Sequence, residues 1–195
     1  MKNPPIYAIP YCPPRLGLPR REPRFGREGL DRAKLRLRNF KPEDLGALVE
    51  IDSLCFPAAL AYNKEHLLGY LRHRFVTTFI AEYDRQIIGF VLVVHHKREE
   101  YVHLVTLDVM PHYQGLGVGK WLLGAVLQMA TSVKVEKIQL EVAVTNRKAI
   151  DLYRTFGFRI TRRLKKYYAD NTNGLLMVLN FGAQSAHLEC TSNEN

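Results

Sequence analysis

The strongest constraint on the fold is one stretch, from Val102 to Ala130, in which three patterns follow without a break. An apolar run, "VHLVTLDVM", predicts a buried strand. The segment "PHYQGLGVG" carries a proline and three glycines at alternate positions, which predicts a turn. "KWLLGAVLQMA" then has the apolar period of a helix. A strand, a glycine turn and a helix in direct succession require a fold that mixes helices with a sheet.

The remaining segments extend this pattern into one predicted domain. A hairpin is expected at 76–96, turning at Asp84-Arg85. Further strands are predicted at 34–40, 136–144, 158–168 and 174–180, and further helices at 41–56, 63–74 and 146–156. The order β-α-α-β-β-β-α-β-α-β-β predicts an α+β fold, in which a mixed sheet carries helices on its faces.

Composition and charge divide the chain into three predicted parts. Residues 1–33 hold seven of the ten prolines and show no sustained period, which predicts a flexible basic arm. Residues 34–181 are expected to form the domain, and 182–195 a polar C-terminal tail. The net charge of +9 is concentrated in residues 1–41, which contain eleven Lys or Arg and three acidic residues. Such an arm is typical of a solvated segment, or of one that contacts RNA, a ribosome or an acidic surface.

Several functional classes are disfavoured. No apolar run approaches the roughly 20 residues that span a bilayer, and the N-terminus lacks the uninterrupted apolar segment of a secretory signal. Cys12, Cys55 and Cys190 are far apart and have no metal-ligand spacing. We therefore expect a cytoplasmic protein with no metal, no membrane contact and no disulfide framework. The oligomeric state is not specified by these features.

The glycine turn allows two interpretations. Two common phosphate motifs do not fit, because Lys120 is followed by Trp121 and the spacing is GxGxG rather than GxGxxG. A plain tight turn would explain the glycines. However, the first N–H groups of a helix lack intrahelical acceptors and lie at the positive end of its dipole, so the same turn also suits a pyrophosphate. The glycines alone do not distinguish these interpretations.

A second stretch, "LEVAVTNRKAIDLYRTFGF", adds Glu141 on a strand, Asn146 at a helix start and Tyr153 about two helical turns later. Together with "TLDVMPHYQGLGVGKWLL", it resembles the GCN5-related N-acetyltransferase (GNAT) superfamily from about Leu35 to Leu179. The resemblance implies the GNAT fold: a twisted, mixed and largely antiparallel sheet of about seven strands, flanked by about four helices and splayed between strands four and five. It also implies acetyl-CoA as the donor and coenzyme A as the product.

In this superfamily a Q/R-x-x-G-x-G/A loop holds the pyrophosphate of acetyl-CoA. The preceding strand is expected to offer backbone groups to the pantetheine arm, with one N–H polarising the thioester carbonyl. Asn146 is expected to cap its helix and also to meet the pantetheine arm. The expected cofactor-binding residues are Leu107, Asp108, Val109, Gln114, Gly115, Leu116, Gly117, Val118, Gly119, Lys120, Asn146 and Tyr153.

Within the superfamily, the chain is most similar to protein N-terminal acetyltransferases. Its second stretch resembles the "LEVRxSNxxAxxLYxxxGF" pattern of ribosomal-protein alanine N-acetyltransferases. "DSLCFPAALAYNKEHLLGYL" resembles the "FPVxYxxxFYxxVL" segment of eukaryotic and archaeal N-terminal acetyltransferases, with an insertion before Tyr62. The likeness implies direct transfer, in a ternary complex, to the α-amino group of a protein or peptide, such as a ribosomal protein or nascent chain. The expected substrate-binding residues are Phe56, Pro57, Tyr62, Tyr167 and Tyr168.

Three side chains are expected to carry the proton transfers. Because an α-amino group has a pKa of about 7.7–8.0, a modest base is enough to neutralise it. The resemblance assigns Glu141 as general base and Tyr153 as the acid that protonates the CoA thiolate. His103 lies where some N-terminal acetyltransferases carry a second catalytic group. Each residue also has an ordinary alternative: a solvent-facing carboxylate, a packing aromatic or a strand histidine.

Two rival functions remain open on the sequence. A GNAT enzyme acting on a small-molecule amine or a lysine side chain would keep the fold, but it would not need the "FP" and "YY" segments of a peptide slot. A non-catalytic module that binds acetyl-CoA or nucleic acid would use the basic arm, but such a module would be expected to lack Glu141 and Tyr153, which are both present.

Overall fold

The computed structural model of the chain describes residues 30–58 and 60–181. Their strands form one sheet in the order β1-β2-β3-β4-β5-β7-β6. The strands are β1 (Leu35–Asn39), β2 (Val76–Tyr83), β3 (Gln86–His96), β4 (Tyr101–Val109), β5 (Lys137–Ala143), β6 (Arg159–Leu164) and β7 (Gly174–Asn180). The α-helices are α1 (Leu45–Cys55), α2 (Lys64–Leu71), α3 (Val118–Ser132) and α4 (Arg147–Thr155). This confirms the predicted mixed fold and element order.

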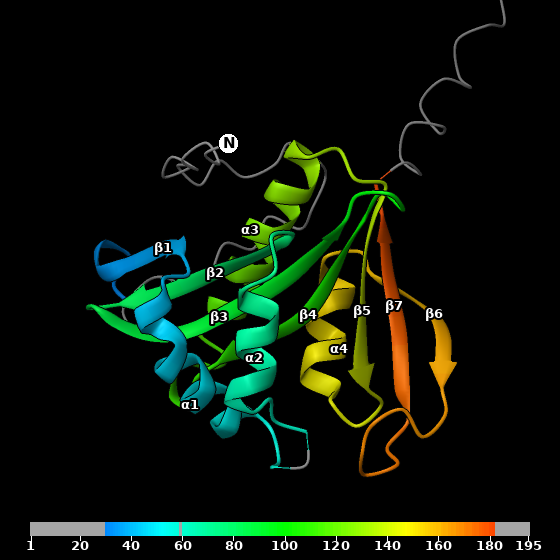
Figure 1. Ribbon diagram of the computed structural model, residues 1–195, viewed down its shortest axis with the longest axis horizontal. Helices are drawn as coiled ribbons and strands as arrows, with labels where there is room; N and C mark the ends of the chain where they lie inside the picture. Colours follow the sequence, from blue (N-terminus) through cyan, green and yellow to red (C-terminus); the bar gives the residue numbers. More distant parts are fainter. Residues whose placement is uncertain (1–29, 59, 182–195) are drawn as a thin grey trace, which may run out of the picture.

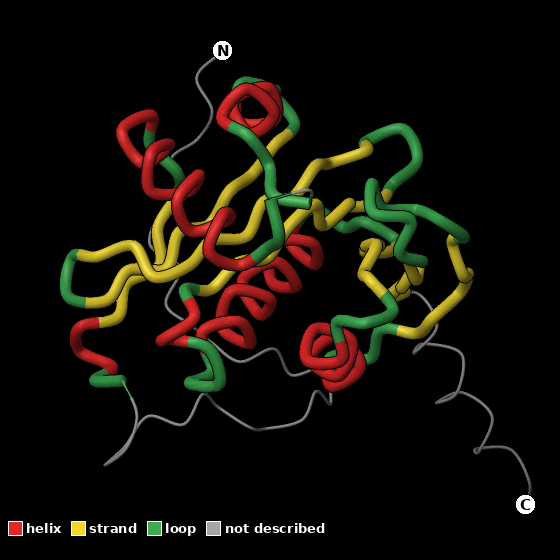
Figure 2. The backbone as a smooth tube through the Cα atoms, turned by 90° about the horizontal axis from the view of Figure 1, so that it is seen from below, coloured by secondary structure: helices red, strands yellow, loops and turns green. Residues whose placement is uncertain are grey.

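The helices cover the two faces of the sheet in pairs (Figures 1 and 2). On one face, α1 and α2 pack over a cluster that includes Leu48, Leu67 and Phe90. On the other face, α3 and α4 pack over a larger cluster that includes Leu122 and Ile150. Burial on both faces explains why β3 and β4 read as nearly continuous apolar runs in the sequence.

Polar caps and turn residues set the element ends much as predicted. The Asn63 side chain accepts a hydrogen bond from the His66 N–H at the start of α2, and Asn146 accepts one from Ala149 at the start of α4. Asp84 and Arg85 both have positive φ, at 51° and 68°, as a two-residue hairpin requires. The β2–β3 hairpin and both helix starts are therefore confirmed.

The strand predicted at 158–168 is shorter than expected, because β6 ends at Leu164. Lys166 adopts a positive φ of 47°, and its N–H donates to the Asn173 side chain instead of continuing the ladder. Tyr167 and Tyr168 therefore lie in the connection between β6 and β7. They do not alternate across a strand.

The predicted arm and tail fall almost entirely outside the described residues. Of the arm, only residues 30–33 are described, and Leu30 is buried against the α3–α4 cluster. No helix within the described residues is long and apolar enough to cross a membrane.

The start of α1 is fixed to the sheet by charge. Arg38 on β1 donates two hydrogen bonds to Asp44, at 2.6 and 2.8 Å, and one to Glu82 on β2, at 2.7 Å. Asp44 also accepts from the Lys41 N–H, which closes the turn that precedes the helix. A bidentate arginine–carboxylate pair sets orientation as well as distance. It anchors α1, which carries part of the site described below.

Two irregularities of β4 shape the site. β4 pairs in parallel with β5 only from Tyr101 to His103, and the other neighbouring strands are antiparallel. A bulge opposite Leu92 and Val93 leaves Val105 as an extra residue. Because of the bulge, His103, Thr106 and Asp108 all point to the α1–α2 face, opposite residues that pack in that cluster.

Candidate active site

The glycine turn presents a set of N–H groups without acceptors. Gly115 and Gly117 have positive φ values of 78° and 91°, which a residue with a side chain rarely adopts. Gly117 is the N-cap of α3. No hydrogen bond among the described residues starts from the N–H of Gly115, Leu116 or Gly117. The first N–H groups of α3 also lack intrahelical acceptors. This arrangement fits the predicted site for the pyrophosphate of acetyl-CoA.

Gln114 has a different contact from the one expected. Its side-chain amide donates to the carbonyl of Val109 at 3.0 Å, and the Cys55 thiol lies 3.2 Å from the same oxygen. The Val109 carbonyl is therefore already an acceptor for two protein groups. We interpret Gln114 as a residue that fastens the glycine turn to the end of β4. Burial and the neighbouring Asp108 carboxyl raise the pKa of the Cys55 thiol to about 12, so it remains protonated.

β4 and β5 separate beyond His103, where the pantetheine arm is predicted to lie. Beyond His103, the edge of β4 that faces β5 has no strand partner in the described chain. The predicted contact residues Leu107, Asp108 and Val109 lie on this stretch. Gly119, in the first turn of α3, lies where an added methyl would meet Leu107 at 3.5 Å. The unpaired backbone of β4 and the first turn of α3 therefore adjoin one another, as a cofactor that spans both would require.

The predicted base and the predicted second catalytic group contact each other. His103 Nε2 lies 2.7 Å from Glu141 Oε2, across the parallel pairing of β4 and β5. Their side chains are 26% and 17% exposed, so both reach solvent from a partly desolvated position. The His96 ring lies 6.4 Å from that of His103 and stacks on Tyr101 at 4.3 Å. Glu141 and His103 can therefore act as one proton-accepting unit.

Tyr153 occupies the opposite side of the gap. It lies on α4, is 6% exposed, and packs against Phe158 within the α3–α4 cluster. Burial raises the pKa of its hydroxyl, and the neighbouring acidic groups of Asp108 and Tyr168 raise it further. Burial keeps it protonated at neutral pH, as a proton donor requires.

Tyrosines form a wall beside the Glu141–His103 pair, which we call the tyrosine wall: Tyr62, Tyr70, Tyr167 and Tyr168. Tyr62 and Tyr70 pack edge to face at 5.9 Å, and Tyr167 and Tyr168 at 5.1 Å. Burial raises the pKa values of Tyr62 and Tyr168, with Tyr167 contributing to both. The charge of Glu141 contributes to the pKa values of Tyr167 and Tyr168. The two predicted walls of the peptide slot therefore lie close together.

For three other predicted residues, the structure shows their burial but, among the described residues, no side-chain contact within the site. Phe56 is half-buried at the end of α1, and Pro57 is exposed. Lys120 is half-buried in the first turn of α3. The sequence reading did not identify Tyr70, or the side chains of Asp52 and Asp108. Tyr70 lies two helical turns after Asn63, but nothing in that helical pattern distinguished it from an ordinary packing residue.

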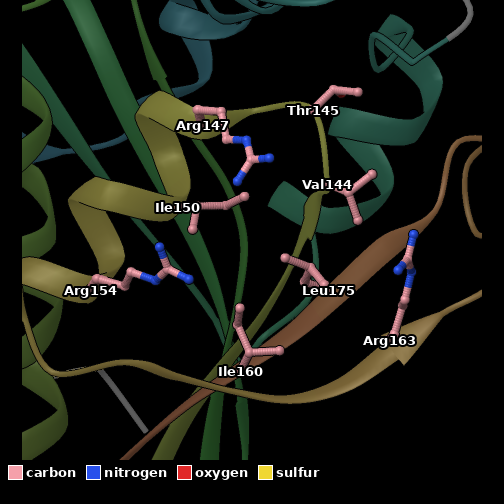
Figure 3. Close-up of a pocket in the computed structure, with 8 residues that line it drawn as sticks. All are labelled: Val144, Thr145, Arg147, Ile150, Arg154, Ile160, Arg163 and Leu175. Carbon is pink, nitrogen blue, oxygen red and sulfur yellow. The ribbon is translucent and has the colours of Figure 1, made fainter.

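A hollow lies away from these residues, against α4, β6 and β7 (Figure 3). It has a volume of about 530 Å³, and Arg147, Arg154 and Arg163 project around apolar side chains that include Ile160. It contains none of the predicted catalytic residues. Across the described residues, no group of three or more His, Cys, Asp or Glu is arranged to hold a metal ion.

Comparisons with known proteins bear on the family and the fold of the chain. The profile of the acetyltransferase (GNAT) family matches residues 45–158. An N-alpha-acetyltransferase from Sulfurisphaera tokodaii is 31% identical over 73% of this chain and 90% of its own. Naa50 from Arabidopsis thaliana, solved with the bisubstrate analogue CoA-Ac-MVNAL, is 26% identical, with a TM-score of 0.66 over 76% of this chain and 99% of its own. The ribosomal-protein-S18-alanine N-acetyltransferase from Escherichia coli shares the fold, with a TM-score of 0.70 at 21% identity over 79% of this chain and 98% of its own.

Proposed function

The chain belongs to the acetyltransferase (GNAT) family, and from this premise we propose that it acetylates the N-terminal α-amino group of a protein or peptide with acetyl-CoA as donor. The observation that carries the proposal is the His103–Glu141 pair, held at 2.7 Å beside the tyrosine wall. The names of the N-alpha-acetyltransferase relatives support the same substrate class. A small amine would not require so extended a wall.

The residues divide the proton transfers between the two sides of the gap. Bound acetyl-CoA would supply the acetyl group as a thioester, in direct transfer within a ternary complex. Glu141 and His103 accept the proton that the attacking amine loses. Tyr153 donates the proton that the leaving thiolate needs. The turn at Gly115 to Gly119 holds the pyrophosphate, and the side chain of Asn146 keeps α4 in place by capping it.

The α-amino group suits this modest base better than a lysine side chain does. Its pKa of about 7.7–8.0 leaves a good fraction neutral at physiological pH, whereas lysine, near 10.4, is almost fully charged. The rival small-molecule and lysine reactions are tested by two peptides of one sequence. The first has a free α-amine and dimethylated lysines, and the second has a formylated N-terminus and free lysines. We expect turnover of the first only; preferential turnover of the second would reject the proposal.

Glu141→Gln is expected to lower kcat/KM at pH 7 by about 10²-fold or more, the lower range for loss of a general base. The loss should shrink as the pH rises towards 9, because the amine then loses its proton to solvent. Initial rates from pH 6 to 9 check this. Glu136→Gln, an exposed carboxylate just before β5, is the matched control and should leave the profile unchanged. An equal loss at every pH would contradict the base assignment.

We also propose that the enzyme, in the cytoplasm, contacts ribosomal RNA. The basic arm and the hollow of Figure 3 support this. Residues 147–166 contain eight Lys or Arg and one acidic residue. Three of these arginines surround the hollow, and the guanidinium fork suits phosphate. The three cysteines are widely separated in the sequence and suggest no disulfide framework, which supports a location in the reducing cytoplasm.

Binding to a labelled single-stranded RNA tests this contact. Three arginine–phosphate contacts predict a slope of about −2 for log K against log salt concentration. Arg154→Ser/Arg163→Ser should weaken binding and flatten the slope, and deletion of residues 1–29 should weaken ribosome association. Arg36→Ser/Arg72→Ser removes two exposed cations elsewhere on the domain and is the control. Equal binding by all variants would remove the RNA proposal and leave the acetyltransferase proposal intact.

A further inference from the structure

Two carboxyl groups are buried together between α1 and β4, outside the set of residues assigned above to proton transfer. Asp52 is 0% exposed and Asp108 is 1% exposed. Asp52 Oδ2 accepts from the Tyr62 N–H at 2.6 Å, and Asp108 Oδ1 accepts from the Thr106 hydroxyl at 2.7 Å. Each carboxyl group shifts the pKa of the other, so the two side chains lie close together. The pair therefore connects the loop before α2 to the strand that borders the cofactor slot.

The second carboxyl oxygen of each residue indicates how the two side chains are joined. Asp52 Oδ1 and Asp108 Oδ2 are both buried, and neither has a hydrogen-bond partner among the described residues. Two carboxylates cannot hydrogen-bond without a proton, because each offers only acceptors. No cation of the described chain contributes to the pKa of either group. Two bare charges in this position would repel strongly, whereas a single proton shared by these oxygens would satisfy both of them.

We propose that this shared proton holds the Tyr62 segment of the tyrosine wall against β4, so that Asp52 and Asp108 are positioning residues for the peptide substrate. The peptide substrate in this inference rests on the proposed function, whereas the pairing of Asp52 with Asp108 rests on geometry. Loss of the proton places two negative charges in contact. The Tyr62 loop then moves away from β4, and the slot loses its shape.

Asp108 is the residue that carries the proton. Its burial is nearly complete, which raises its pKa well above the usual range, with the Asp52 charge adding to the shift. Burial also raises the pKa of Asp52, to about 6, but the N–H of Tyr62 favours its ionised form. The other titratable groups that face the pair are Cys55, Tyr62 and Tyr153, whose pKa values are all raised. They stay neutral, so they neither supply nor compensate a charge.

The direction of the effect on stability follows from this shift. In the unfolded chain Asp108 loses its proton near pH 4, whereas in the folded protein it keeps it to much higher pH. The unfolded state therefore binds fewer protons, and stability falls as the pH rises from about 4 through the folded pKa. Asp108→Asn cannot ionise and keeps a donor for Asp52. Its melting temperature, relative to that of wild type, should rise as the pH rises from 5 to 9.

Asp44 provides the matched control, because it is a buried aspartate with the opposite linkage. Burial opposes its ionisation, but hydrogen bonds from Arg38 and from the Lys41 N–H lower its pKa overall. Asp44→Asn should therefore be less stable than wild type near neutral pH, with the deficit lost as the pH falls through the folded pKa of Asp44. If the stability difference from wild type changes with pH in opposite directions for the two variants, the shared proton is identified and a general effect of removing an aspartate is excluded. A melting difference for Asp108→Asn that stays flat with pH would overturn the proposal.

Peptide kinetics test the positioning role at saturating acetyl-CoA. In wild type, the peptide KM should rise several-fold between pH 7 and 9.5, with a smaller change in kcat. In Asp108→Asn the KM should stay level, and Asp44→Asn should follow wild type. Asp52→Asn is the second variant, because its amide can accept from Tyr62 and donate permanently to Asp108; it should also give a level KM. A KM profile that Asp108→Asn and Asp52→Asn share with wild type would overturn the positioning role.

Infrared spectroscopy of the wild-type protein gives a readout that needs neither a variant nor a substrate. The carbonyl stretch of a protonated carboxylic acid should persist at pH 7.5, where ordinary carboxyl groups are ionised. Its absence would overturn the shared proton. If this band and the melting differences are present but no peptide is acetylated, the proposed function fails and the shared proton stands.

Discussion

Replacing Tyr153 with phenylalanine is expected to lower kcat by about 10²- to 10⁴-fold, the range for loss of a general acid. Phenylalanine keeps the ring that packs against Phe158 and removes only the buried hydroxyl, whose raised pKa keeps it protonated. The affinity for acetyl-CoA should therefore be nearly unchanged. Steady-state kinetics together with calorimetric titration of acetyl-CoA separate the two quantities.

Tyr83→Phe is the matched control for this experiment. Tyr83 is half-buried on β2, and its ring packs against Tyr113, 6.0 Å away, far along the sheet from the gap. Its loss should leave kcat within about twofold of wild type, as for a surface substitution that removes no key contact. Near-wild-type turnover by Tyr153→Phe would reject the general-acid role. Equal losses by both variants would indicate a general packing effect.

The second large effect is on stability, and it concerns a glycine outside the cofactor turn. Gly89 on β3 lies opposite Val109, and an added Cβ would fall 2.6 Å from the Asp108 carbonyl oxygen. Because that oxygen belongs to backbone in a central strand pair, it cannot move aside cheaply. Gly89→Ala should lower the free energy of unfolding by about 1–3 kcal/mol, as overpacking does. In a chain of this size, each kcal/mol lowers Tm by about 2–4 °C.

Gly69→Ala makes the same chemical change, but it is expected to change the free energy of unfolding in the opposite direction. Gly69 lies within α2, where an added Cβ meets nothing within 4 Å. Alanine there should raise the free energy of unfolding by about 0.5–1 kcal/mol, because it reduces backbone entropy in the unfolded chain. Thermal melts of both variants check the pair. Gly89→Ala should also raise the KM for acetyl-CoA, since it displaces β4 beside the slot; an unchanged Tm would show that β3 and β4 can separate without cost.

The fold followed from the sequence because its signals are local. Periodicity gave each element its type, and the caps at Asn63 and Asn146 gave helix starts that the hydrogen bonds confirm. The predicted end of the strand at Tyr168 was wrong, because β6 ends at Leu164 and Lys166 adopts a positive φ just after it. A lysine carries no sequence signal for that conformation, unlike glycine or asparagine.

The site was only partly predictable, because its contacts depend on register and packing. Glu141 and His103 were identified separately, but their contact requires the short parallel pairing of β4 and β5. The Asp52–Asp108 pair joins residues more than fifty positions apart, and it depends on how α1 lies on the sheet. Before that packing is known, Asp52 reads as a polar helix residue and Asp108 as part of a strand. The roles of Glu141, Tyr153 and His103 stay predictions until the variants are measured.

The most direct test of the account is to locate the acetyl group on a product. The purified enzyme is given acetyl-CoA, spermidine and a peptide library that varies at the first two residues and carries free lysines, and the products are read by tandem mass spectrometry. The account predicts single acetylation on the α-amine, with a preference among the N-terminal residues. Acetylation confined to lysine side chains or to spermidine would contradict it.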